Sequence, residues 1–320
     1  MKKDEMVFNE NQFKRVGMLE AFTPEVKEQM EKGVLLIEKK YQKDFDEEHN
    51  TATLYLRKGG ESSRYFLNKF DMEFNKEGQE VKKQTFYLTP PKPKELEDGV
   101  KQKVAPPVKY TLKMAANLMA GRPVFVSRVS AEGKEYTEWE RINFKKQLPN
   151  GNFEIKRYNE NYGFDLDKVL KGYSILELNT PQYEISLKES LYRGNLQLAT
   201  FESKDDTTER FYVSPNITGS SLHVYDEHKN ELSLEKLMEK GYIKPELAEK
   251  LKQERPKEKF SQQDKQEQGS LSKPVLKERA VRNIKPNRQA TQQRRSDSKK
   301  EASENMSQKK TIARKKHKIH

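Results

Sequence analysis

The sequence predicts an α+β fold: small antiparallel sheets with flanking helices, two tandem related α-β-β-β-α units, and a disordered C-terminal tail. Three observations lead to this prediction. Short runs rich in β-branched and aromatic residues alternate with helix start and stop signals. The phrase DLDKVLKGY at 165–173 returns as SLEKLMEKGY at 233–242. From 253 onward the chain has one aromatic residue and no sustained apolar period, so it cannot bury enough surface to offset chain entropy.

The basic character of the chain is confined to its last part. The 320 residues include 62 Lys or Arg and 50 Asp or Glu, a net charge of +12. Residues 253–320 hold 20 of the basic and 8 of the acidic residues, so they carry the whole excess and residues 1–252 are balanced. Hydrophobic residues make up 33% and charged residues 35%, which also indicates a chain that is not folded throughout.

Residues 1–89 are expected to form a helix followed by a β-meander. In FTPEVKEQMEKG, Thr23 is expected to cap a short helix that has Pro24 at its first position and Gly33 at its end. Strand signals follow at 34–41, 51–58, 63–70 and 84–88, with turn signals at 59–60 and 76–79.

The rest of the chain divides at changes of composition. Residues 90–110 are predicted to be a linker, because their prolines remove hydrogen-bond donors and restrict the preceding residues. The two related units are expected at 111–180 and 181–252. The disordered basic tail occupies 253–320.

The two units share landmarks in the same order. Each is expected to open with a helix capped by a hydroxyl, Thr111 or Ser186, and Glu189 completes a capping box in the second. A glycine ends each helix, Gly121 or Gly194, and three strand runs and a helix ending in KGY follow. Repeats of this kind bury their apolar faces against each other. The alternative is coincidence in a sequence rich in Lys and Leu.

The glycines of the two KGY phrases carry a further prediction. Gly172 and Gly241 are expected just past helix C-termini with positive φ, a conformation that glycine adopts without a Cβ penalty. Replacement of either by Ala would then cost about 1 kcal/mol.

Motifs of several enzyme classes are absent from the sequence. There is no G-x-S-x-G, H-E-x-x-H or P-loop pattern and no cysteine, so no catalytic residue, metal site or cofactor is expected. The N-terminus lacks an apolar signal segment, and no run approaches the length of a membrane span. The expectation is a cytoplasmic protein that is not an enzyme and has no membrane partner. An enzyme with an unrecognised site is the alternative.

Aromatic and basic residues gather around one predicted strand set. As a possible ligand face, able to stack bases or a peptide, we identify Arg128, Trp139, Arg141, Tyr158 and Tyr162. The alternative interpretation is that these aromatic residues form core, since not all residues of an alternating strand can face the same side.

Clustered cations in the tail are the clearest partner signal. The predicted contacts to nucleic acid are Arg294, Arg295, Lys299, Lys300, Lys309, Lys310, Arg314, Lys315, Lys316 and Lys318. Runs of this kind neutralise phosphates without sequence specificity, so the expected partner is DNA or RNA. An unknown protein partner is expected for the repeated units. The alternative function is a protein-binding adaptor whose tail only solubilises it.

Several phrases resemble a known but uncharacterised group of proteins. The runs TATLYLRKGGESSRYFLNKFDMEF, YTLKMAANLMAGRPVF and YTEWERINF, with the L-x-x-G-R and Y-x-x-N-Y-G-[FY]-D-L phrases, resemble a domain-of-unknown-function family. That family is carried on conjugative transposons and related mobile elements of Bacteroidota. The resemblance covers about residues 12–230 and implies a mobile-element context; it implies no catalytic residues. The family strand Gly-Arg-x-Val-x-Lys-x-Leu is less complete here, where 121–127 reads GRPVFVS.

Overall fold

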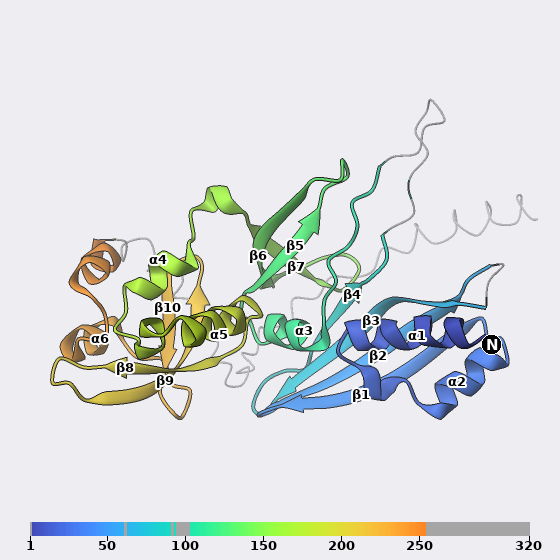
Figure 1. Ribbon diagram of the computed structural model, residues 1–320, viewed down its shortest axis with the longest axis horizontal. Coiled ribbons are helices and arrows are strands. Elements are labelled where there is room, and N and C mark those ends of the chain that lie inside the picture. Colours follow the sequence, from blue (N-terminus) through green and yellow to red (C-terminus); the bar gives the residue numbers. More distant parts are fainter. Residues whose placement is uncertain (1, 61–62, 91–92, 94–102, 254–320) are drawn as a thin grey trace, which may run out of the picture. The chain divides into compact units, whose positions relative to one another are not determined.

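The computed structural model describes residues 2–60, 63–90, 93 and 103–253 (Figure 1). Residues 254–320 of the predicted disordered tail, 253–320, lie outside the described residues. Within them, helices accompany three small antiparallel sheets, so the mixed α+β fold is confirmed. No described helix combines the length and apolar character needed to cross a membrane.

The N-terminal module contains a four-stranded antiparallel meander in the order β1-β2-β3-β4. Its strands are β1 (Leu36–Phe45), β2 (Glu48–Lys58), β3 (Tyr65–Lys76) and β4 (Lys82–Tyr87). The predicted helix is present as α2 (Pro24–Glu31), which begins after Thr23. The Thr23 hydroxyl forms no cap hydrogen bond with a described residue, so the prediction that its side chain caps the helix is wrong. Gly33 follows it with a φ of +73°, so the helix stop is confirmed.

A second N-terminal helix, α1 (Lys3–Arg15), was not predicted. Its buried residues are Asn9 and Phe13. Because one of the two is polar, the sequence lacks the regular spacing of apolar residues that predicts an amphipathic helix. Asn9 Oδ1 accepts from the Tyr65 N–H at 3.0 Å, and Gln12 Oε1 accepts from the Leu67 N–H at 2.9 Å. Gln12 also donates to the Tyr65 carbonyl at 2.7 Å. Two side chains of α1 thus hydrogen-bond to backbone groups in the part of β3 that extends beyond β4.

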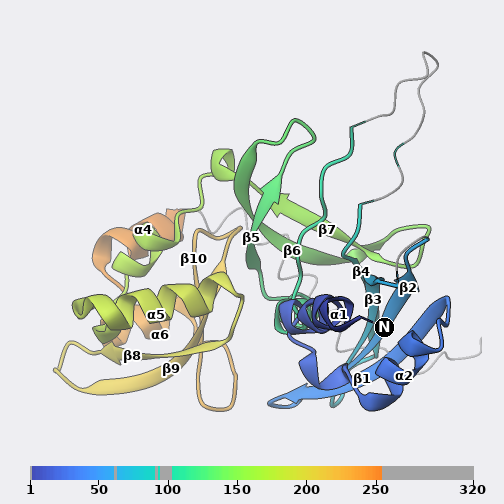
Figure 2. The same ribbon diagram turned by 45° about the vertical axis from the view of Figure 1, so that its right-hand side comes forward.

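One face of this sheet, with three helices against it, makes the first hydrophobic core (Figures 1 and 2). Helix α1 contacts β3, α2 contacts β1, and α3 (Leu112–Met119) contacts β2, β3 and β4. A short 3-10 helix, η1 (Leu19–Ala21), joins α1 to α2. Val108 and Tyr110, from the predicted linker, are also buried in this core.

The second sheet contributes to two cores. Its strands β5 (Val124–Val129), β6 (Glu135–Gln147) and β7 (Phe153–Tyr158) pair in the order β5-β6-β7. Side chains alternate between the two faces of a strand. Accordingly Val124, Val126 and Ile142 lie in the first core. Trp139 lies in the second core, and Phe125 and Tyr158 pack against it.

The third sheet has the same strand order as the second, β10-β9-β8. Its elements are α5 (Pro181–Tyr192), β8 (Gln197–Glu202), β9 (Thr208–Asn216), β10 (Ser221–Tyr225) and α6 (Leu234–Lys240). The first unit closes with η2 (Glu160–Tyr162) and α4 (Leu166–Lys171), and η3 (Leu176–Asn179) connects the two units. Both segments therefore have the predicted α-β-β-β-α order.

Of the two hydroxyl caps predicted to open the units, Thr111 is confirmed and Ser186 is wrong. The Thr111 hydroxyl accepts from the Met114 N–H, and the Ser233 hydroxyl from the Lys236 N–H, both at 3.2 Å. Ser186 lies inside α5, where its hydroxyl donates to the Gln182 carbonyl at 2.9 Å. The expected capping box does not form, because a proline at the first helical position starts the helix five residues earlier.

The two KGY glycines differ. Gly241 has a φ of +79°, as predicted, but Gly172 has a φ of −78°, so the prediction is wrong for Gly172. Its need for glycine is steric instead: a Cβ there would lie 2.4 Å from Leu247 Cδ2.

The ends of the two units pair with each other. The Ser174 N–H donates to the Tyr242 carbonyl at 3.0 Å, and the Lys244 N–H donates to the Gly172 carbonyl at 2.9 Å. Tyr173 and Ile243 form the antiparallel bridge between them. Helix α4, part of the first unit by sequence, buries its apolar residues in the second core. The two KGY segments, which are similar in sequence, are therefore in direct contact in the structure.

Arg122 joins the loops that follow α3 and α5. Its guanidinium forms a two-pronged ion pair with Glu48 at 2.6 and 2.8 Å, and its Nε donates to the Gly194 carbonyl at 3.1 Å. Asn117 donates to the Arg193 carbonyl at 2.7 Å and to Asn195 Oδ1 at 2.9 Å. The arginine of the L-x-x-G-R phrase thus has a structural role between the β1–β2 hairpin and the second unit.

Candidate functional site

Four of the five residues of the predicted ligand face lie together, and Arg128 does not. Trp139, Arg141 and Tyr158 share one face of sheet β5–β7, since Trp139 pairs with Tyr158 and Arg141 lies two residues further along β6. Tyr162 follows in η2 and meets Tyr158 edge to face, with ring centroids 4.8 Å apart. Arg128 lies on the other face, with Glu138 and Glu140. The ten predicted nucleic-acid contacts in the tail lie outside the described residues.

Arg128 is occupied by a buried ionic cluster. Its guanidinium contacts the carboxylates of Glu138 and Glu140, and Arg157 lies 3.7 Å from both. The Tyr110 hydroxyl donates to Glu140, which has no exposed surface. Breaking a buried charge cluster of this type leaves uncompensated charge, so Arg128 is held by the fold and does not contribute to the predicted face.

The environment of this cluster shifts two pKa values. Burial is the main cause that raises the pKa of Glu138, and the nearby Arg128 opposes the rise. Burial, then the charge and hydrogen bond of Glu140, raise the pKa of the Tyr110 hydroxyl. This pair of carboxylates was not predicted from the sequence. The missed signal is the Glu-x-Glu spacing in TEWERI, which puts both side chains on the strand face that bears Ile142.

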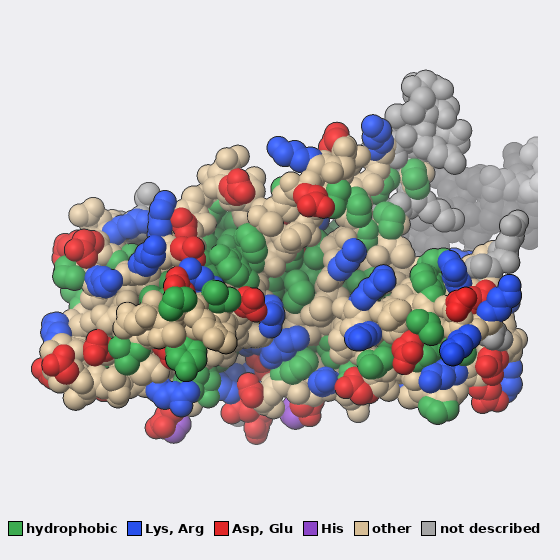
Figure 3. All heavy atoms as spheres, viewed as in Figure 1, with side chains coloured by type: hydrophobic (Ala, Val, Ile, Leu, Met, Phe, Trp, Pro, Cys, Tyr) green, Lys and Arg blue, Asp and Glu red, His purple; other side chains and the backbone are tan. Residues whose placement is uncertain are grey.

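An aromatic pocket lies on the other face of the same sheet. Its volume is about 370 Å³, within the range of roughly 300–1,000 Å³ that is common for small-molecule sites. Hydrophobic side chains gather between the α4–α5 region and sheet β5–β7 in the space-filling view (Figure 3). The pocket's aromatic lining consists of Phe125, Trp139, Tyr158, Phe164 and Tyr192.

Trp139 is the centre of this aromatic lining and is largely core. Only 4% of it is exposed. Its ring meets Phe125 at 5.2 Å, Tyr192 at 5.6 Å and, edge to face, Phe164 at 5.6 Å between centroids. The core interpretation therefore holds for the tryptophan. Tyr162, which is 47% exposed, and the partly buried Tyr158 are the rings still open to a ligand.

Polar groups surround the mouth of the aromatic pocket. They include Thr137, Asn159, Glu160, Asp165 and Lys168. Asp165 caps α4 by accepting from the Lys168 N–H at 3.1 Å. The site therefore combines open aromatic rings with hydrogen-bonding groups, a combination suited to binding a flat, polar-edged group.

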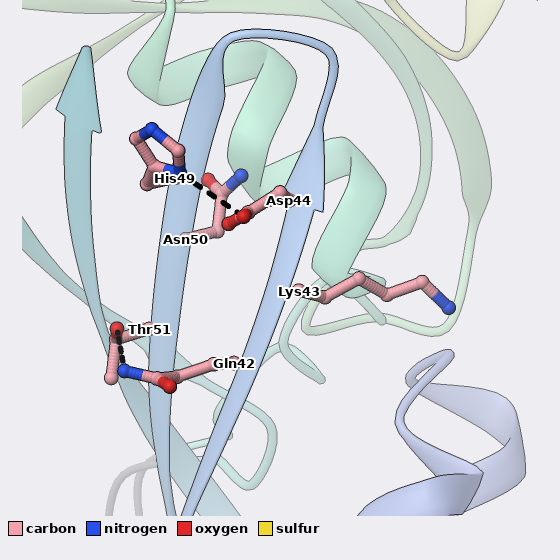
Figure 4. A pocket seen from close by; sticks show the side chains of 6 residues that line it. All are labelled: Gln42, Lys43, Asp44, His49, Asn50 and Thr51. Carbon is pink, nitrogen blue, oxygen red and sulfur yellow. Dashed lines mark hydrogen bonds and ion pairs between the residues drawn. The ribbon is translucent and has the colours of Figure 1, made fainter. Parts of the chain in front are cut away.

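A second, shallower pocket of about 340 Å³ lies on the β1–β2 hairpin (Figure 4). His49 Nδ1 lies 3.1 Å from the Asp44 carboxylate, and Gln42 donates to the Thr51 hydroxyl at 3.4 Å. Asn50 donates to the Glu48 carbonyl at 2.7 Å. All of these partners belong to one hairpin, and the buried Asn50 Oδ1 has no hydrogen-bond partner among the described residues.

His223 and Asp226, on and just after β10, have protein partners. His223 Nδ1 lies 2.6 Å from Glu231 Oε1, and the Asp226 carboxylate accepts from the N–H groups of His228 and Asn230 at 3.0 and 2.8 Å. Across the described part of the chain, no group of three or more His, Asp or Glu side chains is placed to hold a metal ion.

No protein-family model, curated protein or solved structure matches this chain. The resemblance to the mobile-element family therefore stays a prediction.

Proposed function

We propose that this chain is a non-enzymatic accessory protein of a mobile genetic element, which works in the cytoplasm. It binds nucleic acid through its basic tail and a protein partner through the α+β repeats. The observation that carries the proposal is the separation of charge: residues 253–320 hold the entire net charge of +12, while residues 1–252 are balanced. The mobile-element setting rests on the sequence resemblance alone.

The charge separation predicts the binding mode. A balanced folded part has no long-range field that attracts phosphates, whereas clustered Lys and Arg release counterions from a phosphate backbone. Binding should then tolerate any sequence. Its affinity should fall roughly tenfold or more between about 50 and 200 mM salt if several phosphates are contacted.

The test is fluorescence anisotropy of a labelled oligonucleotide across a salt series. A full-length variant with the ten tail cations replaced by Gln should lose most of its binding. Replacing Lys315, Lys316 and Lys318 alone by Gln should lower the slope of log affinity against log salt by about 2 to 3. The matched control replaces three exposed lysines of the folded part, Lys32, Lys83 and Lys146, which are 66%, 68% and 60% exposed.

The control triple should leave the slope unchanged, because its lysines already pair with Glu28, Glu73 and Glu154. An equal loss in both triples would contradict a tail-borne site. The alternative function is a protein-binding adaptor with a solubilising tail. It would be favoured if the unmodified chain binds no oligonucleotide at low salt.

A further inference from the structure

Sheet β5–β7 has two faces of opposite electrostatic character. Toward the first core, the cations Arg128 and Arg157 face the carboxylates of Glu138 and Glu140. Toward the aromatic pocket, Arg141 and Lys156 lie opposite each other in the strand register. Arg128 and Arg157 thus form ion pairs with described carboxylates, whereas Arg141 and Lys156 do not.

Neither cation of the second pair forms an ion pair with a described carboxylate, although the charge of Lys156 is near enough to help lower the pKa of Glu154 on the same face. Arg141 donates its Nε–H to the Gly121 carbonyl at 3.1 Å, and no described carboxylate lies within ion-pair distance of its guanidinium. Lys156 is exposed and likewise forms no ion pair with a described residue. A guanidinium with free N–H groups suits a phosphate oxygen.

The two cations adjoin the open aromatic rings. Tyr158 lies directly across from Trp139 and two residues beyond Lys156. Burial raises the pKa of Tyr158, and the nearby charge of Arg141 opposes this rise, which agrees with a short separation of the two side chains. Phosphate-binding and stacking groups thus lie next to each other on one sheet face.

We propose that this face is a second nucleic-acid contact, one that binds single-stranded nucleic acid by its bases. A base stacks on Tyr158 and Tyr162 at the aromatic pocket, and the adjoining phosphates contact Arg141 and Lys156. This combination of stacking and backbone charge is typical of single-strand binding. Glu160 and Asp165 at the pocket mouth disfavour phosphate there, so the backbone runs on the Arg141 side. The proposal rests on the proposed function and adds base contact to it.

The single tryptophan makes the site observable in the full-length chain. Trp139 is the one tryptophan of the sequence and lines the pocket, so its emission reports on what enters. The probes are an oligothymidylate of about eight nucleotides, within the usual site size, and an abasic oligomer of equal length and charge. Both should raise the anisotropy signal of labelled probe. Only the oligothymidylate should change Trp139 emission.

Matched substitutions separate stacking from a general loss of fold. Tyr158→Ala should weaken oligothymidylate binding roughly tenfold and leave abasic binding unchanged, whereas Tyr158→Phe should keep both. The control is Tyr136→Ala, an exposed tyrosine of the neighbouring strand β6 that lies on the opposite face of the sheet. Lys156→Gln should weaken both probes slightly, and Arg157→Gln on the opposite face should weaken neither.

The outcomes distinguish this face from the tail. Binding of both probes without a change in Trp139 emission would overturn base contact at this face and leave tail binding intact. A peptide of the tail sequence is the alternative occupant of the pocket. If that peptide changes Trp139 emission and the oligothymidylate does not, the proposal of base contact is wrong and the tail occupies the pocket. Emission changes that survive replacement of the ten tail cations would support this face even if tail binding fails.

Discussion

Sheet β5–β7 of the first unit contributes buried side chains to a core on each of its faces, whereas sheet β8–β10 of the second unit packs mainly one face against a core. Val126 and Trp139 of the former lie in different cores. In the latter, Phe201 and Val213 face the core, while Thr200 and Tyr212 stay partly exposed on the other side. Two segments with the same element order thus have different surroundings. Local signals set the order of elements, and the neighbours of each sheet decide what it buries.

The glycines after the first helix of each unit show the same contrast at one residue. Gly121 and Gly194 have φ values of +84° and +78°. Each donates its N–H to a carbonyl three residues earlier, Leu118 or Leu191, at 2.9 Å. A Cβ on Gly121 would meet only Phe144, at 3.8 Å, whereas one on Gly194 would lie 2.7 Å from the Pro123 carbonyl oxygen. Gly121 and Gly194 thus share a backbone conformation but differ in how much room a side chain would have.

The largest expected effect comes from this glycine pair. Gly121→Ala should cost about 1 kcal/mol of unfolding free energy, the penalty of a left-handed residue. Gly194→Ala should cost about 3 kcal/mol, because the clash with backbone adds an overpacking penalty. Urea unfolding monitored by Trp139 emission gives both values, from midpoint shifts at constant slope. Equal costs would show that the close approach of Gly194 to Pro123 is not present in solution.

The same contrast explains how much of the fold the sequence predicts. The strands, α2 and the cap at Thr111 follow from short-range chemistry, and the structure confirms them. Helix α1 was missed because its buried side includes Asn9, whose hydrogen bond to β3 is a tertiary contact. The conformation of Gly172 was mistaken because its constraint is Leu247, far along the chain.

For the candidate site, alternation on β6 and β7 predicted that some aromatic residues pack inward. It did not predict which face each cation takes. Arg128 and Arg141 are both arginines near Trp139 in the sequence, yet only Arg128 meets buried carboxylates. That distinction depends on strand register and on Tyr110 from another segment, neither of which a single strand reveals.

A medium effect is expected at the two KGY glycines, for different reasons. Gly172→Ala should cost about 1–2 kcal/mol by overpacking, since its Cβ would lie 2.4 Å from Leu247. Gly241→Ala should cost about 1–2 kcal/mol through its positive φ, with an added contact to the flexible Lys204 side chain. A double-mutant cycle separates the two causes.

In that cycle, Leu247→Ala should remove most of the cost of Gly172→Ala, while Lys204→Ala should leave about 1 kcal/mol of the cost of Gly241→Ala. Urea midpoints of the four single and two double variants supply the coupling energies. Additive costs for Gly172 and Leu247 would contradict the steric explanation.

The smallest expected effect lies in the two KGY tyrosines, which are both buried and differ in their hydroxyl partners. The Tyr173 hydroxyl accepts from the Leu222 N–H at 3.0 Å. The Tyr242 hydroxyl forms no hydrogen bond of ordinary geometry with a described residue, although the Glu209 carboxylate lies near enough to affect it. Tyr173→Phe should therefore cost about 1 kcal/mol, because the buried Leu222 N–H loses its acceptor. Tyr242→Phe should change stability by less than about 0.5 kcal/mol.

The pH dependence of stability at alkaline pH tests whether the hydroxyls of Tyr173 and Tyr242 are buried. Burial raises the pKa of Tyr173 to about 12, and burial followed by Glu209 raises that of Tyr242 to about 12. A raised pKa means that the folded chain holds a proton that the unfolded chain has lost, so stability should fall as pH rises from about 10 toward 12. Each Tyr→Phe variant should show a shallower fall than the unmodified chain, measured by urea unfolding at several pH values with tyrosinate absorbance as the second signal. An unchanged fall in both variants would mean that the two hydroxyls ionise as freely in the folded chain as in the unfolded one, and that the KGY segments are not paired in the core.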